Sequence, residues 1–180
     1  IFLSRTHPKK YLHFLLDCLQ SVSQPVELSL YGPIDDEIFW AACQSQIKLL
    51  PCHISVTYHG AIGHQYVADT MQQHHLFFFP TRGENFGHVI HEAVQAGCVL
   101  LLSDQTPWQD LSEQQVGWAL PLSNKQGFCD VLADVAGWDE ARWQAHEKAV
   151  RSYASKTNIA GQNRQNHLKM FDVVAKLSDS

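Results

Sequence analysis

A chain of 180 residues is long enough to bury about 70% of the surface that it would expose when unfolded. Its hydrophobic content of 45% and charged content of 17% are typical of a globular protein, and no apolar run approaches the ~20 residues that cross a bilayer. A net charge of -5 argues against a surface that holds nucleic acid through its phosphates.

The five cysteines are dispersed along the chain and include no C-x-x-C pair. Neither a disulfide framework nor a zinc ribbon is therefore indicated, and we expect a reducing, cytoplasmic location. The sequence starts inside an apolar run without an initiator methionine, so we expect it to be a piece of a longer protein.

Apolar runs alternate with helix-like segments over residues 1–122. The runs LFFF and VLLL are apolar at every position, as in strands that are covered on both faces. The alternation predicts a doubly wound, mostly parallel, Rossmann-like α/β sheet, with ligands beyond the carboxyl ends of its strands. In chain order we expect a strand at residues 1–3, a helix at 9–22, a strand at 26–31, a helix at 35–50, a strand at 53–58, a helix at 64–73, a strand at 76–79, a helix at 86–97 and a strand at 98–102.

After residue 122 the pattern changes to helices alone. These additional carboxyl-terminal helices are expected at residues 125–135, 139–155 and 157–177, and we expect them to cover one face of the sheet. No repeat or linker separates them from the preceding segments, so residues 1–180 are predicted to form a single domain.

The segment TRGENFGHVIHEA, residues 81–93, follows an expected strand and leads into an expected helix. Backbone amides at the start of that helix, around His88, Val89 and Ile90, would face the cleft and favour an anion. Gly83 and Gly87 would let the backbone approach a ligand closely.

Four charged side chains are expected at the same sheet edge. Glu84 and Glu92 accept hydrogen bonds when ionised and suit partners that are rich in hydroxyl groups. Arg5 ends the first strand and Lys10 starts the next helix, so the two could neutralise a diphosphate. Taken alone, the two glutamates are equally well explained as surface acids, and Arg5 and Lys10 are better explained as a solvated pair.

The segments FLSRTHPKK, LSLYGPIDD, HGAIG and FFFPTRGENFGHVIHEAVQAGCVLLLSDQTPWQDL resemble the carboxyl-terminal domain of glycosyltransferase family 4. Members of that family are retaining sugar transferases with the GT-B architecture. The resemblance covers about residues 1–122 in family order. One departure is Val99, where many relatives have proline, and this change removes no ligand group.

The resemblance implies roles for individual residues. Glu84 and Glu92 match an E-x7-E motif whose first acid contacts the donor sugar and whose second contacts the ribose. Arg5 and Lys10 match the phosphate-binding residues, which makes Arg5, Lys10 and Glu84 the expected catalytic groups. Further donor contacts are expected from Phe86, Gly87, His88, Val89 and Ile90 in the turn, and from Ile62 against the nucleobase.

The resemblance also implies the partners. The expected donor is a nucleoside diphosphate sugar, with no cofactor and no metal required. The acceptor, a glycan or a lipid-linked glycan, would be bound by an amino-terminal domain absent from this chain. Peripheral membrane contact is compatible with such an acceptor in the longer protein.

Two other functions remain open at this point. The fragment could bind a nucleotide without catalysing a reaction. Alternatively, His88, His91 and Glu92 share a helix face and could bind zinc in a hydrolase, although their order fits neither HExxH nor HxxEH. Trp108 could line the cleft, but we favour a role in capping the core.

Overall fold

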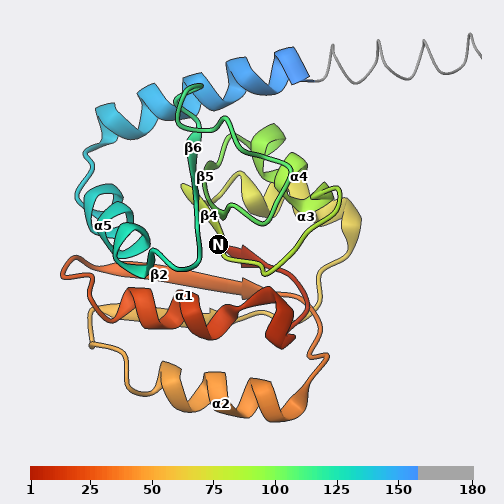
Figure 1. Ribbon diagram of the computed structural model, residues 1–180, viewed down its shortest axis with the longest axis vertical. Helices are drawn as coiled ribbons and strands as arrows, with labels where there is room; N and C mark the ends of the chain where they lie inside the picture. The colour runs from red at the N-terminus through yellow and green to blue at the C-terminus, as the bar shows by residue number, and fades with distance from the viewer. Residues whose placement is uncertain (158–180) are drawn as a thin grey trace, which may run out of the picture.

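A computed structural model describes residues 1–157 (Figure 1). Along this part of the chain, helices separate the first five of six strands, and β6 follows β5 without a helix between them. The strands are β1 (Phe2–Leu3), β2 (Val26–Tyr31), β3 (Ile54–Tyr58), β4 (Leu76–Phe79), β5 (Val99–Ser103) and β6 (Gly117–Leu120). The helices are the 3-10 helix η1 (Pro8–Lys10), α1 (Leu12–Leu19), α2 (Glu37–Ile47), α3 (His64–Met71), α4 (His88–Ala96) and α5 (Lys125–Ala136), followed by a helix over residues 140–157.

The strands form two parallel three-stranded sheets, β1-β2-β3 and β4-β5-β6. Ile1 joins the two sheets, since its carbonyl accepts a hydrogen bond from Phe78 N at 3.1 Å and its nitrogen donates to Leu76 O at 2.7 Å. The resulting spatial order is 3-2-1-4-5-6, with a switch point between β1 and β4 where ligands of such sheets bind. The prediction of a doubly wound, mostly parallel sheet is confirmed.

Helices cover the strands in two groups. Helix α1 packs against α2 and α5, whereas α3 packs against α4 (Figure 1). Between them the side chains of β4 and β5 are buried almost completely, as their uninterrupted apolar sequence predicted. The ring of Phe128 from α5 lies 5.1 Å from Phe14 and 5.7 Å from Phe78, centroid to centroid, and so fixes α5 on the sheet.

Two local predictions were wrong. Strand β6 was not expected, and a single helix was expected over residues 9–22. The chain instead forms η1 and then α1, because Tyr11 between them adopts the left-handed conformation with φ 62°. The expected helix at residues 157–177 lies outside the described residues.

Other helix ends are set by a capping side chain or by a glycine. Asp36 caps α2 by accepting a hydrogen bond from Phe39 N at 2.8 Å. Gly97 closes α4 with a left-handed φ of 91°. Among residues 1–157, no helix has the length and apolar character that spanning a membrane requires.

Candidate functional site

The loop between β4 and α4 is held in one conformation by its backbone. Arg82 N donates to Lys9 O at 2.9 Å, and Glu84 N donates to Gln105 O at 3.0 Å. The buried hydroxyl of Thr81 donates to Gly83 O at 3.1 Å. These bonds connect the loop to η1 on one side and to the segment after β5 on the other.

Lys10 and Glu84 form an ion pair within this framework. Lys10 Nζ lies 2.8 Å from Glu84 Oε2, and the two side chains are only 14% and 22% exposed. The Lys10 ammonium also lies 5.1 Å from the centroid of the Phe79 ring. Burial alone would raise the pKa of Glu84, but Lys10 and the backbone amides of Asn85 and Gly87 outweigh it and lower that pKa.

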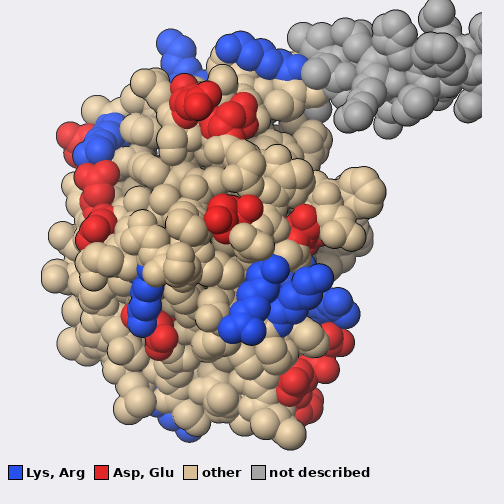
Figure 2. All heavy atoms as spheres, viewed as in Figure 1, with Lys and Arg blue, Asp and Glu red and all other residues tan. Residues whose placement is uncertain are grey.

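Arg5 lies at the same sheet edge, just beyond β1. Its Nη1 is 3.3 Å from Oδ2 of Asp35, which belongs to the loop after β2. The pair is more exposed than Lys10–Glu84, with side-chain exposures of 58% and 37%. Figure 2 shows Lys and Arg side chains gathered in one patch, with acidic side chains beside it.

Helix α4 begins at His88, after Gly87 with φ 69°. A Cβ atom at Gly87 would lie 2.9 Å from Ile90 Cδ1 and 3.1 Å from Trp108 Nε1, so a side chain here would strain the left-handed backbone and displace these neighbours. The expectation of a free amide at Ile90 is wrong, because Ile90 N donates to Gly87 O at 2.9 Å. His88 and Val89 occupy the first two helical positions, where amides have no acceptor within the helix.

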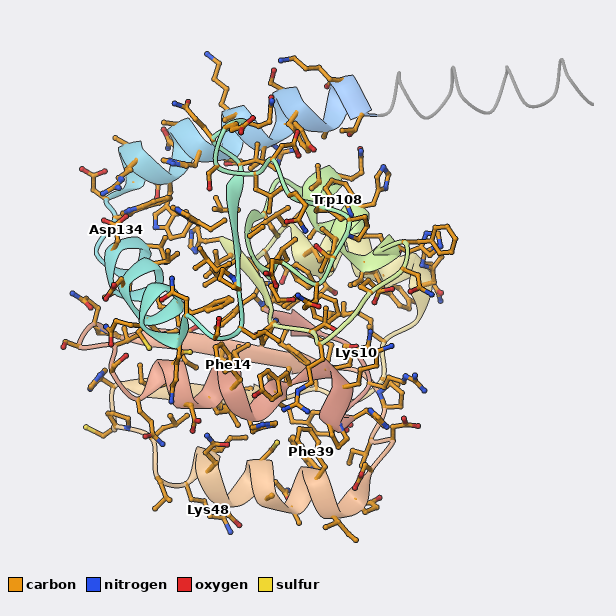
Figure 3. All side chains as sticks on the ribbon, viewed as in Figure 1. Lys10, Phe14, Phe39, Lys48, Trp108 and Asp134 are labelled. Carbon is orange, nitrogen blue, oxygen red and sulfur yellow. The ribbon has the colours of Figure 1, made fainter. Side chains whose placement is uncertain are left out.

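Trp108 packs against both the core and the start of α4. Its ring is partly buried and lies 6.4 Å from that of His91. Figure 3 shows Trp108 and Lys10 on opposite sides of the loop that joins β4 to α4. The preference for a core-capping role of Trp108 is confirmed, although the residue also borders the site.

The second acid of the motif lies further along α4. Glu92 Oε1 is 3.1 Å from Nδ1 of His64, the first residue of α3. Ile62 precedes α3 and is partly buried against the core. Phe86 is 76% exposed, and its ring lies 6.0 Å from that of His88.

The described residues contain no group of three or more His, Cys, Asp or Glu side chains placed to hold a metal ion. His88, His91 and Glu92 therefore do not assemble the zinc site of the hydrolase alternative. His91 instead packs toward Trp108, and Glu92 pairs with His64.

Sequence reasoning did not find the partners of the charged residues. Asp35 and His64 hold Arg5 and Glu92, but each is separated from its partner by about 30 residues. Arg82 was also not among the expected site residues, although its position two residues before Glu84 indicated that it lies near the site.

Residues 1–137 match the family described as glycosyl transferases group 1. A search of the curated proteins found no match. The fold is similar to that of HepE from Anabaena in complex with UDP and glucose, with 19% identity, a TM-score of 0.73, and coverage of 93% of this chain and 47% of that one. It is also similar to sucrose-phosphate synthase from Thermosynechococcus elongatus, with 20% identity, a TM-score of 0.72, and coverage of 96% and 45%.

A third similar structure is WaaG, a glycosyltransferase involved in lipopolysaccharide biosynthesis. It shares 17% identity and a TM-score of 0.69, with coverage of 86% of this chain and 41% of that one. At these identities the likeness concerns the fold. The chain spans less than half the length of these three solved structures.

Proposed function

Because the chain belongs to the glycosyl transferases of group 1, we propose that it is the donor-binding part of an enzyme that uses a nucleoside diphosphate sugar. The observation that carries the proposal is the contact of Lys10 with Glu84 at the switch point between β1 and β4, with Arg5 at the same edge. A cation for phosphate and an acid for hydroxyl groups meet there. The acceptor side and the complete activity are assigned to a longer protein.

In the proposed complex, Arg5 and Lys10 bind the diphosphate together with the amides that open α4. Glu84 accepts hydrogen bonds from the donor sugar. Glu92 accepts those of the ribose, and Ile62 packs on the nucleobase. The complex of the similar HepE structure with UDP and glucose supports this class of donor.

The proposed reaction transfers the glycosyl group to an acceptor hydroxyl with retention at the anomeric carbon, as in glycosyltransferase family 4. Departure of the nucleotide leaves negative charge on the β-phosphate, and Arg5 and Lys10 stabilise that charge as it develops. A preplaced donor of this kind contributes about 3–4 kcal/mol, or ~10²–10³ in rate. Protein cations would then provide the stabilisation that a metal ion gives in other transferases.

The ion pair between Lys10 and Glu84 is compatible with the binding of phosphate by Lys10 and of sugar hydroxyl groups by Glu84. An ammonium has three donors, and a carboxylate has about four acceptor positions. Lys10 uses one donor on Glu84, and Glu84 also accepts hydrogen bonds from the backbone amides of Asn85, at 3.1 Å, and Gly87. Both groups therefore keep positions for the donor's phosphate and hydroxyl oxygens.

Calorimetric titration of residues 1–180 with UDP, GDP, ADP and their sugars tests the proposal. We expect one nucleoside diphosphate to bind, and Arg5→Ala or Lys10→Ala to weaken it by about 1.5–3 kcal/mol, roughly 10- to 150-fold in Kd. Arg142→Ala is the matched control, since its exposed pair with Asp134 belongs to α5 and the helix after it. Equal affinities for all four proteins would refute the assignments.

A further inference from the structure

Two cations beside the candidate site have no carboxylate partner within the part of the chain that the structure describes. Among residues 1–157, Arg5 pairs with Asp35 and Lys10 with Glu84, whereas neither Lys9 nor Arg82 forms an ion pair. The basic cluster, defined as Arg5, Lys9, Lys10 and Arg82, thus carries two uncompensated positive charges. It contains four of the 13 Lys and Arg residues of a chain whose net charge is -5, so the excess is local.

The guanidinium group of Arg82 is held against an aromatic ring. Its guanidinium carbon lies 4.2 Å from the centroid of the Tyr11 ring, and that ring stacks on Phe14 at 5.2 Å. The backbone nitrogen of Arg82 is bonded to Lys9 O at 2.9 Å. A stacked guanidinium loses little freedom when it binds an anion, because its side chain is already ordered.

Tyr11 supports this arrangement with a rarely used backbone conformation. It is one of two non-glycine residues with positive φ in the described part of the chain. Its left-handed φ turns the chain between η1 and α1, and its ring lies beneath Arg82. Strained positions of this kind persist where the surrounding structure requires them and gather at functional sites.

Lys9 and Arg82 lie on the η1 side of the proposed donor site, with the Lys9 side chain next to Gly83. That site runs from Glu84 through the turn at Gly87 to Glu92. Arg82 is stacked on Tyr11 and its backbone nitrogen is bonded to Lys9 O, on the η1 side of the loop, whereas a Cβ atom at Gly87 would lie 3.1 Å from Trp108 Nε1. If Glu84 holds the sugar, Arg82 is on the sugar side and away from the ribose.

We propose that Lys9 and Arg82 form a second anion site that binds a phosphate group of the acceptor, while the rest of the acceptor is bound by the longer protein. This inference rests on the proposed function, because it places the acceptor next to the sugar held by Glu84. A phosphate monoester carries about -1.5 to -2 charges near pH 7, which matches one guanidinium and one ammonium. A guanidinium can also bind phosphate oxygens in a bidentate manner.

Calorimetry with glycerol 3-phosphate at low ionic strength tests the site in residues 1–180. The titration is made without nucleotide and with saturating UDP, or with GDP or ADP if one of these binds more tightly. We expect phosphate binding in both conditions and at least a tenfold loss in Arg82→Gln and Lys9→Gln. Lys125→Gln removes an equal charge on α5 and should leave this binding unchanged.

A second experiment tests whether the bound phosphate belongs to a lipid headgroup. Wild type and Arg82→Gln are sedimented with vesicles of phosphatidylcholine alone or with added phosphatidylglycerol. Retention that needs the anionic lipid and Arg82 assigns the phosphate to a lipid-linked acceptor. Binding of glycerol 3-phosphate without such retention assigns it to a soluble acceptor.

Two results would overturn the proposal. Phosphate affinity that is unchanged in both variants would show that the cations do not form a site. A loss of nucleotide affinity in Arg82→Gln as large as the loss of phosphate affinity would assign both cations to the donor. Failure of every nucleoside diphosphate to bind, with phosphate binding retained, would instead count against the proposed function.

Discussion

Replacement of Lys10 by methionine removes the ammonium from Glu84 and keeps most of the aliphatic stem. The separation of 2.8 Å corresponds to about 6 kcal/mol of Coulomb attraction at an effective dielectric constant of 20. Desolvation and side-chain ordering offset most of this energy. With exposures of 14% and 22%, the pair lies between exposed pairs, worth about 0–1 kcal/mol, and buried pairs, whose disruption costs about 3–5 kcal/mol.

We therefore expect Lys10→Met to lower the free energy of unfolding by about 2 kcal/mol near pH 7. Glu84 keeps the amides of Asn85 and Gly87, which limits the loss. Urea denaturation of residues 1–180 measures the change. Lys125→Met is the control, because its pair with Asp17 is 49% and 42% exposed and should contribute less than about 1 kcal/mol.

The pH dependence of the stability difference between wild type and Lys10→Met provides a second test. In the folded protein the pKa of Glu84 is lowered from its ordinary value of 4.5. The ion pair therefore stabilises the fold fully above pH 4.5, and this stabilisation is lost as the pH falls through the folded pKa. The difference between wild type and Lys10→Met should therefore shrink below about pH 4.5. A difference that is no larger than in the Lys125→Met control, or that persists unchanged in acid, would refute the reasoning.

Two further substitutions test the framework around the site by urea denaturation. Gly87→Ala should destabilise the protein by about 1–3 kcal/mol, because φ is 69° and the new Cβ would lie 2.9 Å from Ile90 Cδ1. Gly83→Ala is the control for stability, since its Cβ would meet only the flexible Lys9 side chain at 3.4 Å, and an equal loss of stability in both variants would contradict the argument. Phe128→Ala should cost about 3–5 kcal/mol, since the ring is fully buried, whereas Phe86→Ala, 76% exposed before the change, should cost less than about 0.5 kcal/mol. A small loss for Phe128→Ala would show that α5 is not held by this contact.

The sequence was sufficient to predict the strands that consist of an uninterrupted apolar run. Residues 76–79 and 99–102 are apolar throughout and form the buried β4 and most of β5. Strand β6 has only four residues, and three of them are partly exposed, so its composition carries little signal. It forms because Gly117 lets the backbone pass close to β5, where a Cβ would lie 2.0 Å from Leu100 O. That approach depends on tertiary structure and not on the local pattern.

The same distinction applies to the charged residues. The positions of Arg5, Lys10 and Glu84 follow from strand ends, because parallel strands bring their carboxyl ends to one edge. Their partners do not follow in this way. The pairing of Arg5 with Asp35 depends on how two crossover loops meet, and Tyr11 adopts a conformation that local propensity disfavours.

The pairing pattern has a consequence for ligand binding. The structure gives an ion-pair partner to each of Arg5, Lys10, Glu84 and Glu92, with distances between 2.8 and 3.3 Å. In the proposed function, a bound donor therefore replaces part of an existing ion-pair contact and does not bind to an unpaired charge. The binding free energy is the difference between the new contacts and those that are weakened, so we expect residues 1–180 alone to bind the donor weakly. Lys9 and Arg82 incur no such loss, which is why an anion at those two residues should bind independently of the donor.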